Sequence, residues 1–344
     1  MKKTLYAALA LVVGLAFPTQ LLANGEGTTD DKKQNYANSK FVWTDNYVVE
    51  GNHAAMAPST EEIVTTLLSK KGEPMRWVRK NDIYKFGKYT GTSTLETALY
   101  NMAVDEMINN FEKDGTLRTG LYWGGVWTRD VSYSSLLSLA YMCPDKVRNS
   151  LEVKIDRMGR IIQDTGTGGS WPCSSDRVVW ALSAWNIYLA TGDMEWLQKA
   201  YPIIVKSLEC DDMVVYNPQT GLYRGESSFI DWREQSYPTW AQPADIYLSE
   251  CLGTNAAFYG VLKVTADMAA ALGHKKDAKK YAQKAEALKQ AINDRFWVEE
   301  DGFYASYWYG RQNLIRTQHS ETLGESFCVL FGIADEERAA KVIS

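Results

Sequence analysis

The 344-residue sequence predicts an all-α fold in which antiparallel helical hairpins form a toroid, after a short β or irregular lead-in. Two observations support this prediction. From Ser93 onward, apolar residues recur at helical spacing, and the connections between the expected helices alternate between short and long. Alternate connections of antiparallel hairpins lie at opposite ends, so the long ones should gather on one face of the toroid. Loops carry most functional side chains, and we therefore expect the function on that face.

The N-terminal segment, residues 1–23, predicts a secretory signal peptide. Lys2 and Lys3 precede an apolar run, and "LLA" supplies a cleavage sequence that ends at Ala23. The alternative, a membrane-spanning helix, is disfavoured because the run is shorter than the ~20 residues that a bilayer requires, and no later segment predicts a span. A secreted or periplasmic protein is expected. Residues 24–40 are typical of a flexible leader, and residues 41–92 indicate a few strands or an irregular lead-in.

The helical domain expected over residues 93–344 begins with the capping box "STLE", from Ser93 to Glu96. Helices are predicted at residues 94–113, 127–141, 145–163, 174–191, 194–210, 249–272, 275–295, 320–332 and from 335 onward. The long connections span residues 114–126, 164–173, 211–248 and 296–319. Nine helices do not complete a ring of hairpins, and the ninth ends without a cap, so we expect the sequence to be part of a longer chain, with the toroid incomplete.

The composition excludes several classes of site. The formal net charge of −5 becomes −7 when Lys2 and Lys3 leave with the signal peptide, which argues against a nucleic-acid partner. Three histidines, and five cysteines without a Cys-x-x-Cys motif, predict neither a metal site nor a cofactor. The cysteines are expected to be buried small residues, with one disulfide as an alternative. Carboxylates must therefore carry most proton transfer, while 12 Trp and 20 Tyr suit either sugar stacking or core packing.

Aromatic and glycine residues are concentrated on the long connections and at the helix starts that follow them. The stretches are "GLYWGGVWTRD" (120–130), "GTGGSWPCSSDR" (166–177), "GESSFIDWREQSYP" (225–238) and "YASYWYGRQ" (304–312). Trp123, Trp127 and Trp171 lie close to glycines that permit a close approach, so they are candidates for stacking on a sugar ring. Core packing is the alternative for each of them.

Charged residues in these stretches have two interpretations. Arg129 and Asp130 either bind a substrate or form a buried ion pair, and the same choice applies to Asp176 and Arg177. Three expected helices begin with Ser followed by an acid, which is also the pattern of a simple helix cap: 174–176, 249–250 and 320–321.

The alternation of connection lengths, "WTRD" at 127–130 and the Glu-Ser-Ser-aromatic-x-Asp loop at 226–231 together resemble a known group. It is the six-hairpin (α/α)6 glycosidases, among them trehalase, glucoamylase, processing α-glucosidase and mannosylglycerate hydrolase. The resemblance covers residues 93–344, about three quarters of the chain. It implies an (α/α)6 toroid and a glycoside hydrolase, inverting in mechanism, that cleaves an α-glycosidic bond in an oligosaccharide or polysaccharide.

The resemblance also implies roles for individual residues. "ESSFID" is similar to the trehalase-type signature Glu-Ser-Gly-Trp-Asp, which places the general acid at Asp231. The interval in this chain is one residue longer than in the signature, so Glu226 is the alternative acid. "WTRD" is similar to the stretch by which glucoamylase-like enzymes hold the terminal sugar, which implies that Arg129 and Asp130 bind its hydroxyls. Substrate binding is also expected from these residues: Trp123, Trp127, Asp176, Arg177, Trp232 and Arg233.

The chemistry of inversion agrees with a pair of carboxyls. A protonated acid and a carboxylate base must lie about 6.5–9.5 Å apart, on opposite sides of the sugar. Apolar neighbours would help Asp231 to keep its proton, whereas an inward Arg233 would oppose that shift. The resembling families supply the base from a late loop that this sequence does not contain, and Glu250 and Glu321 are substitutes for it. A lyase or epimerase that uses His319 or Tyr, and a non-catalytic sugar-binding protein, are the alternative functions.

Overall fold

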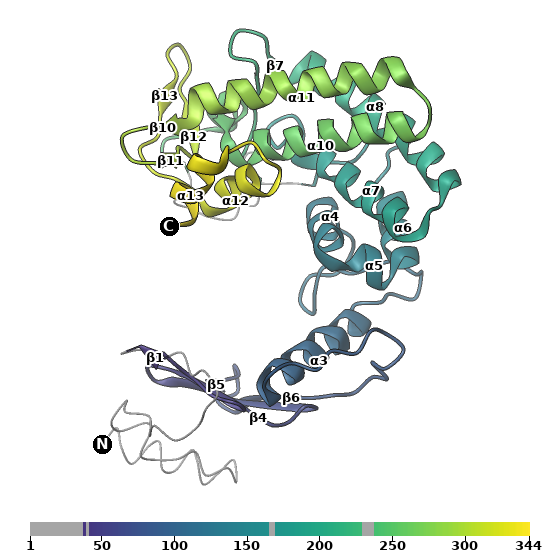
Figure 1. Ribbon diagram of the computed structural model, residues 1–344, viewed down its shortest axis with the longest axis vertical. Helices are drawn as coiled ribbons and strands as arrows, with labels where there is room; N and C mark the ends of the chain where they lie inside the picture. Colours follow the sequence, from purple (N-terminus) through teal and green to yellow (C-terminus); the bar gives the residue numbers. More distant parts are fainter. Residues whose placement is uncertain (1–36, 39–40, 165–168, 229–236) are drawn as a thin grey trace. The chain divides into compact units, whose positions relative to one another are not determined.

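The computed structural model describes residues 37–38, 41–164, 169–228 and 237–344, and the chain divides into two compact units, Met1–Asn110 and Phe111–Ser344. In the described residues, Figure 1 shows the N-terminal unit as strands together with helix α3 (Thr94–Asn109), and the C-terminal unit as mainly helical. The expected signal peptide and most of the leader lie outside the described residues. Within the described part, no helix has the length and apolar character needed to span a membrane.

The N-terminal unit contains a six-stranded antiparallel sheet in which each strand pairs with its neighbour in the chain. The strands are β1 (Ala37–Asn38), β2 (Phe41–Trp43), β3 (Tyr47–Glu50), β4 (His53–Ser59), β5 (Glu62–Leu68) and β6 (Pro74–Val78). Helix α3 (Thr94–Asn109) packs on this sheet through a core of Ala57, Ile63, Leu95 and Ala98. The capping box that the sequence predicts is present, because the Ser93 hydroxyl accepts from the Glu96 amide and the Glu96 carboxylate accepts from the Ser93 amide.

The first unit is therefore longer than the lead-in expected at 41–92. The helix predicted at 94–113 belongs to the sheet-containing unit and ends at Asn109. Asp105 on α3 connects the helix to the sheet, since its carboxylate accepts hydrogen bonds from the Trp77 indole at 3.0 Å and from the Asn81 backbone amide at 2.8 Å.

The C-terminal unit follows the predicted succession of helical hairpins. Its helical segments are α4 (Thr128–Ser134), η1 (Ser135–Leu139), α5 (Ala140–Met142), α6 (Pro144–Glu152), η2 (Asp176–Val179), α7 (Trp180–Thr191), α8 (Met194–Val214), α9 (Pro243–Leu248), α10 (Leu252–Ala271), α11 (Lys275–Phe296), α12 (Thr322–Leu330) and α13 (Glu336–Ile343). Short strands decorate the long connections: β7 (Tyr216–Asn217), β8 (Leu222–Tyr223), β9 (Glu250–Cys251), β10 (Trp297–Val298), β11 (Phe303–Tyr304), β12 (Tyr307–Tyr309) and β13 (Ile315–Arg316).

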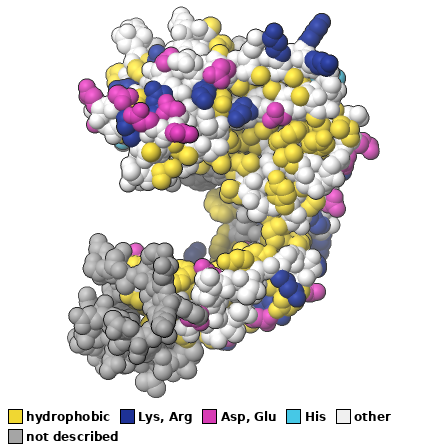
Figure 2. All heavy atoms as spheres, in the orientation of Figure 1, with side chains coloured by type: hydrophobic (Ala, Val, Ile, Leu, Met, Phe, Trp, Pro, Cys, Tyr) yellow, Lys and Arg dark blue, Asp and Glu magenta, His cyan; other side chains and the backbone are white. Residues whose placement is uncertain are grey.

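Inner and outer helices are distinguished by their burial. Helix α10 is buried on nearly all sides and packs against α7, α8, α11 and α12. Its partner α11 buries one stripe, which includes Tyr281, Leu288 and Ile292, and exposes lysines on the opposite side. Figure 2 shows Lys and Arg side chains at the surface in the upper part of the view, where Figure 1 has α11. The inner helices α4, α7, α10 and α12 pack in sequence, so their N-terminal ends meet on one side, at the long connections.

Several expectations about the local structure are wrong. The helix predicted at 145–163 ends at Glu152, because Asp156 accepts from the amides of Met158 and Arg160 and closes a turn instead. Helix α9, which is six residues long, was not predicted. All five cysteines lie in the described part and none forms a disulfide; three of them, Cys143, Cys251 and Cys328, are buried.

Candidate active site

A buried ion pair joins the first two inner helices of the C-terminal unit. Arg129, in the first turn of α4, donates through Nε to Asp176 Oδ2 at 2.7 Å and through Nη2 to Oδ1 at 3.2 Å. Arg129 is 7% exposed and Asp176 is 1% exposed. Forked pairing of this kind uses the planar guanidinium to fix both position and orientation. The pair therefore holds the start of α4 against η2.

The Asp176 carboxylate has further donors around it. Ser228 Oγ donates to Oδ2 at 2.5 Å, and Gln163 Nε2 donates to Oδ1 at 2.8 Å. Burial alone would raise the pKa of Asp176, but the Arg129 charge and these hydrogen bonds outweigh it and hold the pKa below its usual value. Tyr133, also on α4, shares a hydrogen bond of 2.9 Å with Ser228, and burial raises the pKa of its phenol. Asp176 is thus an anion at neutral pH.

A second buried ion pair is formed by Arg177, the residue that follows Asp176. Arg177 donates to Asp211 Oδ1 at 2.9 Å, and its guanidinium lies 4.7 Å from the centre of the Trp171 ring. The Trp171 indole also donates to Asp211 Oδ1, at 2.8 Å. Burial raises the pKa of Asp211 to about 6 despite the neighbouring charge. Its other oxygen, Oδ2, has no hydrogen-bond partner in the described part, which agrees with a carboxyl that readily holds a proton.

Glu226 is 1% exposed and packs against the segment that precedes η2. Its amide donates to Cys173 O at 2.7 Å, and its carbonyl accepts from the Thr254 hydroxyl at 2.5 Å, so the backbone is fixed on both sides. The Ser174 hydroxyl contacts both Glu226 Oε2 and Gly169 O. These two contacts connect the Glu226 side chain to the segment that precedes η2.

Gly225 allows the loop that carries Glu226 to pack closely against the segment that precedes η2. Its φ is +123°, and a Cβ atom at this position would lie 2.6 Å from Ser175 Oγ and 3.0 Å from Cys173 O. Glycine alone adopts this conformation without strain, and it also leaves the space that the neighbouring segment fills. The residue thus places Glu226 next to Ser174.

The two carboxylates proposed as substitute bases differ in their surroundings. Glu250 is fully buried in β9 and accepts from Asn217 at 2.7 Å and from Thr220 at 2.6 Å. Glu321 is the N-cap of α12 and accepts from the amides of Leu323 and Gly324. The Ser-acid pattern does not produce a capping serine hydroxyl at any of the three helix starts: Ser175 is the N-cap of η2 but makes no side-chain capping hydrogen bond, and Cys251 and Glu321 are the N-caps of α10 and α12.

A small cavity opens beside the start of α4. It has a volume of about 230 Å³ and is lined by Thr119, Trp123, Trp127 and Asp130. Trp123 is 54% exposed, so a large part of its ring faces solvent. The cavity is smaller than the ~300–1,000 Å³ that drug-sized ligands occupy, which suits one sugar ring.

The structure places Arg129 in contact with Asp176, and Glu226 next to the segment that leads to Asp176. Hydrogen bonds connect Arg129, Asp176 and Ser228, while Glu226 contacts Ser174, two residues before Asp176. The alternative in which Asp176 and Arg177 form an ion pair with each other is wrong, because Asp176 binds Arg129 and Arg177 binds Asp211. Three further predicted residues lie outside the described residues, and their placement stays a prediction: Asp231, Trp232 and Arg233.

Sequence reasoning missed two members of these networks. Ser228 lies in the quoted loop, and only its spacing from Glu226 could have drawn attention to it. Asp211 lies near the end of α8 without any motif around it, so no local signal could have identified it.

Residues 163–344 match the family model of the bacterial alpha-L-rhamnosidase six-hairpin glycosidase domain. The chain belongs to this family. The matched residues form more than half of the chain and contain Asp176, Glu226 and Glu321. The resemblance to six-hairpin glycosidases, and with it the (α/α)6 fold class, is therefore confirmed. Members of this family are glycoside hydrolase domains. No curated protein matches the sequence.

Three solved structures align with this chain at low sequence identity. A mannosylglycerate hydrolase of Thermus thermophilus aligns with a TM-score of 0.54 and 13% identity, over 70% of this chain and 75% of that one. A rhamnosidase of Bacillus sp. GL1 aligns with a TM-score of 0.48 and 18% identity, over 65% of this chain and 23% of that one. A rhamnosidase of Klebsiella oxytoca with rhamnose bound has a TM-score of 0.48 and 16% identity, over 63% of this chain. The chain spans 23% and 40% of the lengths of these two rhamnosidases.

Proposed function

We propose that the chain carries part of the active site of a secreted or periplasmic glycoside hydrolase that removes an α-linked terminal sugar with inversion. An α-L-rhamnoside is the first substrate to test, because the matching family model is that of a rhamnosidase domain. The observation that carries the proposal is the hydrogen-bonded cluster of Arg129, Asp176 and Ser228 at the ends of the inner helices. Within this cluster, Ser228 follows Glu226 by two residues in the sequence and precedes Asp231 by three.

In this proposal Asp231 is the general acid that protonates the leaving oxygen, and Glu226 is the alternative. Support for the alternative comes from the position of Glu226, which is 1% exposed and accepts a hydrogen bond from the Ser174 hydroxyl. Burial favours the protonated form of a carboxyl, which is the form that the acid role requires. The base is assigned to neither Glu250, whose carboxylate is enclosed by Asn217 and Thr220, nor Glu321, whose carboxylate caps α12.

Binding and positioning are divided between two groups of residues. Trp123, Trp127 and Asp130 line the small cavity and contact one sugar ring, with the exposed face of Trp123 as a stacking surface. Arg129 acts through Asp176, since its guanidinium is committed to that carboxylate by two hydrogen bonds. In the same way, Arg177 positions Trp171 through the shared Asp211 carboxylate.

The test compares Asp231→Asn with Glu226→Gln in the full-length protein, on an aryl α-L-rhamnoside and on a rhamnose-containing disaccharide. The variant that removes the acid should lower kcat by about 10²–10⁴-fold on the disaccharide and much less on the aryl glycoside. The aryl leaving group departs without protonation, whereas a loss of folded protein would affect both substrates equally. Glu300→Gln, a change of the same kind at an exposed position, is the control and should behave as the wild type.

The stereochemistry and the substrate are read from the same reactions by NMR. Inversion predicts that the first sugar released carries the β anomeric configuration. Equal losses on both substrates for Asp231→Asn and Glu226→Gln would exclude both residues as the acid. Absence of hydrolysis across a panel of α-glycosides by the full-length protein would overturn the proposed function itself.

A further inference from the structure

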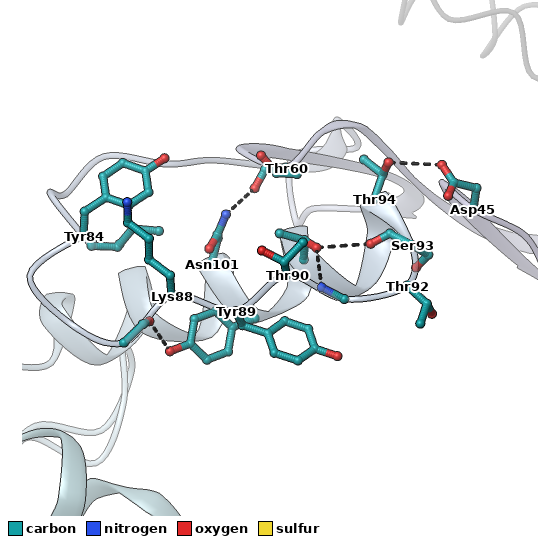
Figure 3. A pocket seen from close by; sticks show the side chains of 15 residues that line it. Asp45, Thr60, Tyr84, Lys88, Tyr89, Thr90, Thr92, Ser93, Thr94 and Asn101 are labelled. Carbon is teal, nitrogen blue, oxygen red and sulfur yellow. Dashed lines mark hydrogen bonds between the residues drawn. The ribbon is translucent and has the colours of Figure 1, made fainter.

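The N-terminal unit holds a cavity of its own, between α3 and the loop that leads from β6 into it (Figure 3). Its volume is about 450 Å³, inside the ~300–1,000 Å³ range of small-molecule sites. All of its lining residues lie between Asp45 and Asn101, within the sheet-containing unit. The cavity therefore shares no residue with the candidate active site.

The lining is rich in hydroxyl groups, which nine of the fifteen lining residues carry. In the part of the chain that the structure describes, no hydrogen bond occupies the hydroxyls of Thr60, Tyr89 or Thr90. Asn101 is 8% exposed and donates through Nδ2 to Thr60 O at 2.9 Å, which leaves its amide oxygen as an acceptor. Figure 3 shows the Asn101 nitrogen directed towards Thr60 and the oxygen directed away from it. Such a lining complements a ligand that carries several hydroxyls.

An aromatic ring is fixed at the edge of this lining. Tyr89 is 45% exposed, and its ring packs on Tyr100 with 5.3 Å between centroids. Tyr100 is itself held by its hydroxyl, which donates to Gly87 O at 2.5 Å. The ring of Tyr84 is flanked by Arg79 and by Lys88, each 5.2 Å from its centre, and is thus engaged by cations. Tyr89 is the ring that offers a supported, open surface for stacking.

The charges of the lining are balanced. Asp45 and Lys88 are its charged residues, one of each sign. Asp45 accepts from the Thr94 hydroxyl at 3.1 Å, and the Lys88 ammonium lies over the Tyr84 ring. No excess of either sign selects for an anion or a cation. The hydroxyl-rich walls and the open ring instead suit a neutral, polyhydroxylated molecule.

We propose that this cavity is a non-catalytic binding site for a neutral saccharide. One sugar ring stacks on Tyr89, and its hydroxyls bind Thr60, Thr90 and the amide oxygen of Asn101. The inference goes beyond the proposed hydrolysis and does not depend on it, because the two sites have no residue in common. The unit would hold a second sugar, or a distant part of a glycan chain, while the helical unit acts on another.

The experiment measures the binding of methyl α-L-rhamnoside, methyl α-D-mannoside, maltose and cellobiose by ligand-observed NMR, with the full chain and three variants. Tyr89→Ala removes the stacking ring and should weaken binding of the bound sugar about tenfold or more. Thr90→Val removes one hydroxyl without disturbing any internal hydrogen bond and should weaken it about three- to tenfold. Met75→Ala changes an exposed side chain of the same unit, outside the cavity, and should bind as the wild type.

Melting temperatures of the three variants, and their rates on an aryl glycoside, are measured in parallel. Loss of sugar binding in Tyr89→Ala with an unchanged melting temperature and rate supports the second site. The inference is overturned if Tyr89→Ala weakens the binding of no sugar in the panel, or if sugar binding and hydrolysis are lost together in this variant. Failure of hydrolysis in the wild type, with binding that still depends on Tyr89, would remove the proposed function and keep this inference.

Discussion

Replacing Asp176 by Asn isolates the buried ion pair at the centre of the candidate site. The change keeps the size of the side chain but removes the negative charge that faces Arg129 at 2.7 and 3.2 Å, in a position that is 1% exposed. Breaking a buried pair by removing one partner costs about 3–5 kcal/mol. The amide oxygen can still accept one of the other hydrogen bonds, from Ser228 or Gln163, so we expect the lower end, about 3 kcal/mol. For a domain of this size the melting temperature should fall by about 6–12 °C.

Urea unfolding at pH 7, followed by tryptophan fluorescence, measures this loss. Glu152→Gln is the matched control, because it breaks the exposed Glu152–Lys199 pair and should cost less than about 1 kcal/mol. The pKa of Asp176 lies below its usual value of 3.8, so the advantage of the wild type should be full above pH 4 and decline as the pH falls through the lowered pKa. The reasoning is refuted if Asp176→Asn is no more destabilising than Glu152→Gln at pH 7.

Three further predictions concern single residues. Burial raises the pKa of Asp211 from 3.8 to about 6, so between these pH values the folded state binds a proton that the unfolded state has lost. The stability of the wild type relative to Asp211→Asn should therefore fall as the pH rises from 4 to 6. A difference in stability that does not change with pH in urea titrations contradicts the raised pKa. Gly225→Ala should lower the free energy of unfolding by more than about 2 kcal/mol in the same titrations, because φ is +123° and the new Cβ would clash. Gly159→Ala, where the new Cβ would have no atom within 4 Å, should lower it by about 1 kcal/mol. Equal losses would mean that the clash at Gly225 is relieved. Trp123→Ala should raise KM for the glycoside about tenfold with an unchanged melting temperature, as its ring is 54% exposed; an unchanged KM would show that the ring does not contact the sugar.

The long helices were predictable because their apolar residues recur at the spacing of an α-helix. Helices α10 and α11 begin and end within three residues of the predicted bounds, since a largely apolar inner helix and an amphipathic outer one both have strong helical patterns. The end of α6 was not predictable from the pattern, because apolar residues continue at Ile155, Ile161 and Ile162. There the Asp156 carboxylate competes for backbone amides and closes a turn.

The site was only partly predictable, for a different reason. Arg129, Asp176 and Glu226 could be selected because charged residues stood among aromatic and glycine residues on long connections. Their partners could not be assigned, since Asp176 meets Arg129 at a separation of 47 residues and Ser228 at a separation of 52. An ion pair between sequence neighbours such as Asp176 and Arg177 is the simplest expectation from the sequence, but the side chains of successive residues at a helix start point in different directions.

The hydrogen bonds that connect α4, η2 and the loop at Ser228 also constrain the order in which the protein acquires its shape. The hairpin of α10 and α11 closes through neighbouring residues, whereas Arg129, Asp176 and Ser228 come together only when about 100 residues of chain have been placed between their ends. Loop closure over such a length is entropically costly until the intervening hairpins have formed. A ribosome releasing the chain from its N-terminus would expose the Arg129 side chain well before Ser228 is made. The cluster is therefore assembled late, and a nascent chain that stops before residue 228 contains Arg129 on α4 and Asp176 on η2 but cannot complete the cluster.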